Sequence, residues 1–404
     1  MNHKKQVRFG SFRIAVRAGM LLLLAVCLLA LSSCGLLELD VGGGGRNPSA
    51  TTAPVTTVRD PSLYQPLTFD QYLTPEIPKE AGTYVYATQV AAPSVVSIST
   101  EAIVYSPYDG SYIESGAGSG VVCHVDSEKG ITYIITNNHV VEGYSSISVY
   151  KNGSATEYPA EVVGTDWQTD IAVLCVGSAD FKAATFGNSQ QLLVGQEVAA
   201  IGNPLGLLGG TMTDGRVSAL DRQIEVGGVP MTLIQHSAAV SPGNSGGGLF
   251  NLYGQCVGIV NAKSTGTGVE GLGYAIPIDL ALARAGQIIA QGYVSGTPYL
   301  GIAYASSSSG VAVSSYLYNS ELESTSQTAL QNGDILYSLN DVQIAKVEDV
   351  RKVLSRCEIG DTVSGVFYRS SGYGRYVKIT VNLIVHEYIP AGQASPPTGS
   401  GDLG

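Results

Sequence analysis

Short apolar runs recur along the middle of the chain and alternate with turn residues. Between residues 94 and 278 they read SVVSIST, GVVCHV, TYIITNNHVV, SISVYK, AEVVGT, IAVLCV, EVAAIG, MTLIQH, CVGIV and GYAIPI. Apolar runs of this kind, bounded by Gly, Asn and Asp, predict β-strands. Because no long helical pattern separates them, the sequence predicts an antiparallel sandwich or barrel.

The first clear helical pattern is DLALARAGQIIAQGYV at 279–294, and a second unit follows it. There YLGIAY, GVAVSSY, GDILYSLND and TVSGVFYR predict strands. The stretch KVEDVRKVLSRC predicts a helix with one apolar face, formed by Val347, Val350, Leu354 and Cys357. We therefore predict a mainly β domain over 82–296 and a smaller α+β domain over 297–388.

Both ends of the chain have a different composition. Residues 35–81 are rich in Gly, Pro, Ser and Thr, as in VGGGGRNPSATTAPVTTV, and residues 389–404 are similar. Such segments lack the apolar residues needed for a core, so we predict a flexible linker and a disordered tail.

Residues 1–34 have the pattern of an export signal. Basic residues precede the apolar run AGMLLLLAVCLLAL, and the run leads to LSSC, which ends at Cys34 and resembles a bacterial lipobox. This predicts a lipoprotein of the cell membrane with lipid on Cys34. The alternative is an uncleaved anchor, because 20 residues from Ala18 to Leu37 can span about 30 Å. Both alternatives place the remaining chain outside the cytoplasm.

Charge and cysteine content exclude two classes of function. The net charge is -11, and no basic stripe is visible, so nucleic acid is not an expected partner. Cys123, Cys175, Cys256 and Cys357 have no CxxC spacing, so no metal site is predicted. Buried free thiols are the default expectation for them, with a disulfide as the alternative.

Three polar residues stand at places that suit nucleophilic catalysis. His139 follows an apolar strand in IITNNHVVEG, Asp170 precedes one in TDIAVLCV, and Ser245 lies in the glycine-rich stretch SPGNSGGGLF. Each alone has an ordinary structural explanation as a turn or strand-end residue. Together they form the set that activates a serine, namely a nucleophile, a base and a carboxylate that orients the base.

The stretches TNNHVVEG, TDIAVL and PGNSGGGL, with AIGNPLG, GRVSAL and GYAIPID, resemble the signatures of the HtrA/DegP family of trypsin-like serine proteases. The resemblance covers residues 90–390. It implies a chymotrypsin-like double antiparallel β-barrel in which His139, Asp170 and Ser245 form the catalytic triad. It also implies an oxyanion hole formed by the N–H groups of Gly243 and Ser245, and a substrate pocket with Ala239 at its floor.

Two departures from the family pattern are visible near the serine. Asn244 stands where trypsin-like zymogens carry an aspartate, so activation by cleavage is not expected. The stretch QHSAAVSPGNSGG has His236 and Ser237 where family members commonly have Thr-Asp, and this leaves the local loop geometry open.

The C-terminal unit resembles a PDZ domain. YLGI, from Tyr299 through Leu300 and Gly301 to Ile302, matches the loop with which HtrA-type PDZ domains bind a peptide C-terminus. The stretch NSELESTSQTALQNGD lacks the usual family elements, so the fold is better supported than the binding.

The sequence therefore predicts a membrane-tethered extracytoplasmic serine endopeptidase without a cofactor. The resemblance implies unfolded or misfolded polypeptides as substrates, peptide C-termini as PDZ ligands, and a homotrimer, since family members are often trimers. The alternative function is a catalytically silent barrel that binds peptides. An intact triad argues against this alternative.

Overall fold

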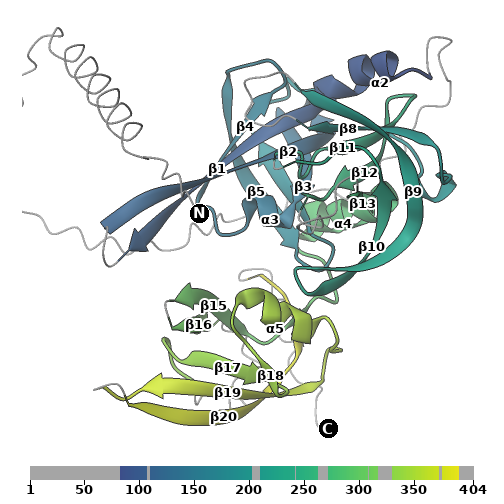
Figure 1. The fold of residues 1–404 in the computed structure, drawn as a ribbon. Coiled ribbons are helices and arrows are strands. Elements are labelled where there is room, and N and C mark those ends of the chain that lie inside the picture. The colour runs from purple at the N-terminus through teal and green to yellow at the C-terminus, as the bar shows by residue number, and fades with distance from the viewer. Residues whose placement is uncertain are drawn as a thin grey trace, which may run out of the picture. The chain divides into compact units, whose positions relative to one another are not determined.

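The computed structural model describes residues 82–390 except 107–109, 203–209, 242, 263–271, 308, 317–329 and 373–374. The predicted leader, the linker and nearly all of the predicted tail lie outside these residues. Figure 1 shows the strands and helices in their order along the chain.

Six strands close into the first barrel, in the order β1-β2-β3-β6-β5-β4. All neighbours are antiparallel. The strands are β1 (Val95–Ser106), β2 (Gly110–Asp126), β3 (Ile131–Asn137), β4 (Ser146–Lys151), β5 (Glu157–Asp166) and β6 (Ile171–Val176).

A second sheet has the order β11-β8-β9-β10-β13-β12-β7, and an additional pairing of β11 with β12 closes its first six strands into a ring. The predicted fold class, a mainly β double barrel, is therefore confirmed. The strands are β7 (Thr185–Phe186), β8 (Glu197–Gly202), β9 (Thr211–Val226), β10 (Val229–His236), β11 (Gly248–Asn251), β12 (Gln255–Val260) and β13 (Gly273–Pro277).

Alternation along the strands divides the apolar side chains between separate cores. In β3, Ile134 belongs to the cluster inside the first barrel, whereas its neighbour Ile135 belongs to a cluster shared with the second sheet. Successive side chains of a strand point to opposite faces, so one strand serves both cores. The shared cluster also includes Ile288 and Ile289 of helix α4 (Ile278–Gln291).

The C-terminal unit combines one helix with a small sheet. Strands β15 (Ile302–Ser307), β16 (Gly310–Tyr316), β17 (Ile335–Leu339), β19 (Thr362–Ser370) and β20 (Tyr376–Ile384) pair in this order, and β18 (Val342–Gln343) pairs with β17. Strand β14 (Pro298–Tyr299) pairs with β21 (His386–Glu387). In helix α5 (Val347–Leu354), Val350 and Leu354 are buried in this unit's core.

Several local predictions need correction. A helix, α2 (Tyr84–Ala91), with the short 3-10 turn η3 (Ala92–Ser94), precedes the first strand, although the first clear helix was expected at 279. The stretch TYIITNNHVV is only partly a strand, because α3 (Asn138–Val141) follows β3 directly. A 3-10 turn, η4 (Ser189–Gln191), also lies within the predicted strand region. The described residues contain no helix long and apolar enough to cross a membrane.

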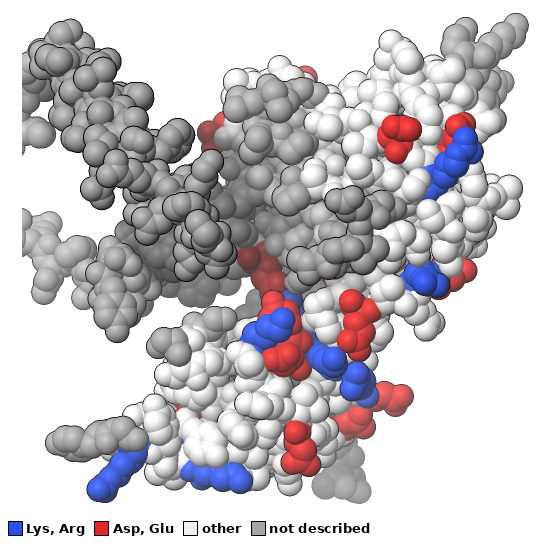
Figure 2. Space-filling model, in the orientation of Figure 1, with Lys and Arg blue, Asp and Glu red and all other residues white. Residues whose placement is uncertain are grey.

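Charged residues of both signs lie side by side on the face shown in Figure 2. The described ion pairs include Arg216 with Glu197, and Lys352 with Glu225. None of the four described cysteines forms a disulfide: Cys123 and Cys256 are buried, and Cys175 and Cys357 are partly buried.

His236 lies at the end of β10 with no exposed surface. Burial lowers the pKa of its imidazole from 6.5 to about 4, because the charged form loses its hydration. The folded chain therefore takes up this proton at lower pH than the unfolded chain. The stability contributed by the neutral ring is complete above about pH 6.5 and is lost as the pH falls toward 4.

We predict that His236→Thr makes the stability less sensitive to pH. Between pH 7.5 and 4.5 the native protein should lose about 2 to 3 kcal/mol more of its unfolding free energy than the variant loses, following from the cited pKa change. Urea unfolding of both proteins at the two pH values measures this difference. Equal losses of unfolding free energy in the two proteins would contradict the lowered pKa of His236.

Candidate active site

The short helix α3 holds His139 directly after strand β3. The strand ends at Asn137, and the chain then turns through Asn138–Val141. The backbone N–H of His139 donates to Asp170 Oδ1 at 2.9 Å, and the N–H of Asn138 donates to the Asp170 carbonyl at 3.0 Å. The start of this helix is thus fixed by one residue that is distant in the sequence.

Asp170 is buried, and its backbone has a φ of 55°, in the left-handed region that non-glycine residues seldom occupy. Its carboxylate accepts three hydrogen bonds. Besides the His139 N–H, the ring Nδ1 of His139 lies 2.6 Å from Oδ2, and Asn261 Nδ2 donates to Oδ2 at 2.9 Å. Because a carboxylate only accepts, Nδ1 carries the ring proton and Nε2 is free to accept one.

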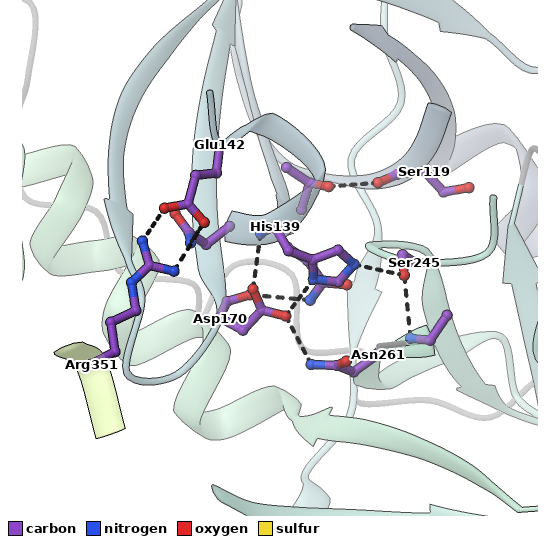
Figure 3. Close-up of polar contacts among 11 residues, drawn as sticks. Ser119, His139, Glu142, Asp170, Ser245, Asn261 and Arg351 are labelled. Atoms are coloured by element: carbon purple, nitrogen blue, oxygen red, sulfur yellow. Dashed lines mark hydrogen bonds and ion pairs between the residues drawn. The ribbon is translucent and has the colours of Figure 1, made fainter. Parts of the chain in front are cut away.

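Ser245 completes the arrangement in Figure 3. Its Oγ lies 3.0 Å from His139 Nε2, and the backbone N–H of Ala262 donates to the same Oγ at 3.2 Å. With one lone pair occupied by Ala262, the hydroxyl proton is directed toward His139. The structure thus brings together the three residues that the sequence analysis selected.

Asn261 and Ala262 were missed by the sequence analysis. They follow strand β12, about 90 residues after Asp170, and nothing in the stretch CVGIVNA marks them as part of a site. The only available signal was their position at the end of a buried strand, where side chains reach a cleft.

Backbone contacts from the first barrel hold the loop around Ser245. Ser119 in β2 donates its N–H to the Ser245 carbonyl at 2.7 Å, and its hydroxyl donates to the Gly243 carbonyl at 2.5 Å. Gly246 has a φ of 81°, and a Cβ there would lie 2.2 Å from the Ser119 carbonyl oxygen. Gly243 has a φ of 102°. Both positions favour glycine because of their positive φ, and at Gly246 a side chain would also collide with Ser119. The oxyanion hole of Gly243 and Ser245 stays a prediction.

Ala239, the predicted pocket floor, is exposed, and its carbonyl accepts a hydrogen bond from Thr213 Oγ1 at 2.7 Å. Ser237 is held locally: its Oγ accepts the Arg216 N–H at 2.9 Å.

In the C-terminal unit, Leu300 and Ile302 are buried and belong to its core, and Gly301 has a φ of 70°. Tyr299 packs edge-on against Tyr388, with ring centroids 5.3 Å apart, and burial raises the pKa of its phenol. The side chains of this loop are therefore used for packing. The predicted ligand site would be formed by its backbone.

One further ion pair lies beside the site. Arg351 of α5 donates from Nη1 to Glu142 Oε2 at 2.9 Å, and Glu142 follows helix α3 directly (Figure 3).

The described residues hold no cluster of His, Cys, Asp and Glu suited to a metal ion. Cys34 lies outside the described residues.

A family model for the trypsin-like peptidase domain matches residues 118–259, a span that includes His139, Asp170 and Ser245. Among solved structures, the HtrA-type protease AlgW with decapeptide is 27% identical with a TM-score of 0.48, and the match covers 76% of this chain and 100% of that one.

Two curated relatives are similar over about three fifths of the chain. The serine protease Do-like HtrB of Bacillus subtilis (strain 168) is 38% identical over 266 residues, covering 60% of this chain and 57% of that protein. The serine protease Do-like HtrA of Lactococcus lactis subsp. lactis (strain IL1403) is 36% identical over 284 residues, covering 63% and 68%. The chain thus spans less than two thirds of the Bacillus relative. At this identity and coverage of the Lactococcus protein, the chain belongs to the HtrA-type, or Do-like, serine proteases.

Proposed function

We propose that this protein is a serine endopeptidase that hydrolyses peptide bonds in unfolded or damaged exported polypeptides. One observation carries the proposal. Asp170, His139 and Ser245 form a continuous hydrogen-bonded series, with 2.6 Å between carboxylate and ring and 3.0 Å between ring and hydroxyl. This series is the arrangement that converts a weakly nucleophilic hydroxyl into an attacking group.

In the first half of the reaction, Ser245 Oγ attacks the carbonyl carbon of the scissile bond. His139 Nε2 accepts the hydroxyl proton, and Asp170 stabilises the resulting imidazolium. His139 then donates this proton to the leaving amine, the C–N bond breaks, and the acyl group stays on Ser245. In the second half, His139 takes a proton from water, whose oxygen attacks the ester carbon. The bond between the acyl carbon and Ser245 Oγ then breaks, His139 returns the proton to Oγ, and the acid leaves.

The negative charge on the substrate oxygen needs fixed donors. We assign this role to the N–H groups of Gly243 and Ser245, and such a donor is worth roughly 3 to 4 kcal/mol in the transition state. Support for this assignment comes from the loop contacts to Ser119, which hold the chain rigidly at both residues.

We further propose that the C-terminal unit is a PDZ domain that binds peptide C-termini. The backbone of Leu300, Gly301 and Ile302 would hold the carboxylate, while the peptide adds as a strand beside β15. The buried side chains of Leu300 and Ile302 support this, because they leave the backbone as the group available to a ligand.

Ser245→Ala in the full-length protein should abolish cleavage of casein and leave folding intact. Loss of the nucleophile typically costs several orders of magnitude in rate, whereas the change in volume is small. Peptide release from casein measures the first effect, and urea unfolding measures the second. Cleavage at a near-native rate would show that Ser245 is not the nucleophile.

Asp170→Asn serves as a second variant in this experiment. Asparagine has nearly the same size and tolerates the left-handed backbone, but its amide cannot stabilise an imidazolium. It should therefore fold like the native protein and cleave casein at least about 1000-fold more slowly. A fall of only a few-fold would remove Asp170 from the mechanism.

Substrate choice should follow from Ala239. An alanine at the pocket floor offers no charge to pair with Lys or Arg, and burying an apolar group gains about 0.8 kcal/mol per methylene. Cuts in casein, mapped by mass spectrometry, should therefore fall mainly after Val, Ala and Ile. Ala239→Asp should move cuts toward Lys and Arg. A majority of native cuts after Lys or Arg would contradict the pocket assignment.

We propose that the chain is tethered to the outer side of a bacterial cell membrane through lipid on Cys34. Cys34→Ala should abolish labelling of the expressed protein by a palmitate analogue, and Cys27→Ala should leave it unchanged. Labelling that survives Cys34→Ala would exclude the lipid attachment at this residue. No labelling of the native chain would favour the uncleaved helix instead.

A further inference from the structure

Strands β1 and β2 continue beyond the first barrel as a two-stranded hairpin, which projects from the barrel in Figure 1. β1 pairs with β4 only over 96–101, and β2 pairs with β3 only over 121–126. The ladder between β1 and β2 continues without a bulge from Val95↔Val121 to Ser106↔Gly110. Over residues 111–117, β2 therefore has one edge that no other described strand covers.

The direction of the backbone groups along this edge follows from Ser119. Its N–H donates to the Ser245 carbonyl and its carbonyl accepts from Thr136 Oγ1, so both groups point away from β1. In a regular strand the direction repeats every second residue. The N–H and C=O groups of Ala117, Ser115 and Ile113 therefore point the same way, and no described residue bonds to them.

Side chains of these same residues share the face on which Ser119 contacts Gly243. Ile113 lies opposite Ile103 as a directly facing pair, and the two side chains are 63% and 74% exposed. At about 3.3 Å per residue, Ile113 lies about 20 Å along the strand from Ser119. An uncovered row of backbone groups thus leads from the nucleophile loop to an exposed apolar pair.

We propose that this hairpin is a binding site for unfolded substrate, in which an extended segment of the polypeptide adds as a strand along residues 113–117 of β2 and packs apolar side chains on Ile103 and Ile113. This inference rests on the proposed peptidase activity and specifies how that activity selects unfolded chains. Within a folded domain the strands are already hydrogen-bonded to their neighbours, so they are not available to pair with this edge.

An unfolded chain fits this edge better than other occupants do. Protein sheets usually protect such edges with Lys, Pro or a bulge, and residues 110–120, GSYIESGAGSG, contain none of these. The edge is also continuous with Ser119 and Ser245, so one extended chain can occupy the edge and reach the nucleophile.

The test compares long and short substrates on the full-length protein. The double variant Ile103→Ser/Ile113→Ser should raise KM for casein about tenfold, by loss of two apolar anchors. For a fluorogenic hexapeptide with three residues on each side of the cut bond, kcat/KM should stay within twofold, because about 10 Å of chain cannot reach Ile113. The matched control is Leu193→Ser/Val194→Ser, which removes an exposed apolar pair outside the hairpin and should change neither value.

A proline variant tests strand addition separately. Ser115→Pro removes an N–H that points away from β1, so the hairpin ladder is retained while the donor to an added strand is lost. It should raise KM for casein several-fold, and Ser115→Ala should not. An unchanged KM in both the proline and the isoleucine variants would overturn the proposal. An equal loss on casein and hexapeptide would also overturn it, since the variants would then act on the active site.

Failure of the proposed function gives a different result. If the native protein cleaves neither substrate, the peptidase assignment is wrong, and binding then decides the inference. Fluorescently labelled casein should bind the Ser245→Ala protein about tenfold more tightly than the same protein carrying Ile103→Ser/Ile113→Ser. Equal affinities, or a change in oligomeric mass caused by the hairpin variant, would contradict a substrate site.

Discussion

The carboxylate and carbonyl of Asp170 are the groups on which the arrangement of the site depends. A left-handed aspartate costs on the order of 1 kcal/mol, and here the hydrogen bonds to both groups offset that cost. The carbonyl accepts from Asn138 and Asn137, and the carboxylate accepts from His139 and Asn261. One residue therefore fixes the start of helix α3, the tautomer of the histidine ring and the end of strand β12.

Strand β2 holds the loop around Ser245 in place, as Asp170 holds His139. Ser119 binds the carbonyls of both Gly243 and Ser245, and a Cβ at Gly118 would lie 2.5 Å from Val140. The first barrel thus provides His139, Asp170 and part of the support for the loop around Ser245. The same strand continues into the projecting hairpin. The hairpin is therefore joined by one continuous strand to Ser119, which bonds to the loop around Ser245.

The sequence alone predicted the strand-rich architecture, and it selected the three residues that the structure brings together, because both leave local signals. Apolar runs with turn residues at their ends mark strands, and the glycines around Ser245 mark a strained loop. Asn261 and Ala262 could not be found in this way, since their roles depend on the contact between strands distant in sequence. The length of the hairpin was also hidden, because the amino-acid sequence over 101–117 has no regular apolar alternation.

The support of the nucleophile loop bears on activation. In zymogens a newly cut N-terminus pairs with an aspartate before the serine, whereas this chain has the neutral, buried Asn244. Backbone bonds take the place of that charge: Gly246 N–H donates to the Val260 carbonyl at 3.0 Å, and Val260 N–H donates to the Gly247 carbonyl at 2.8 Å. With Ser119 bonded on the other side, strands from both barrels hold the loop. These bonds hold the loop with Ser245 Oγ 3.0 Å from His139 Nε2, without a charge pair of the zymogen kind.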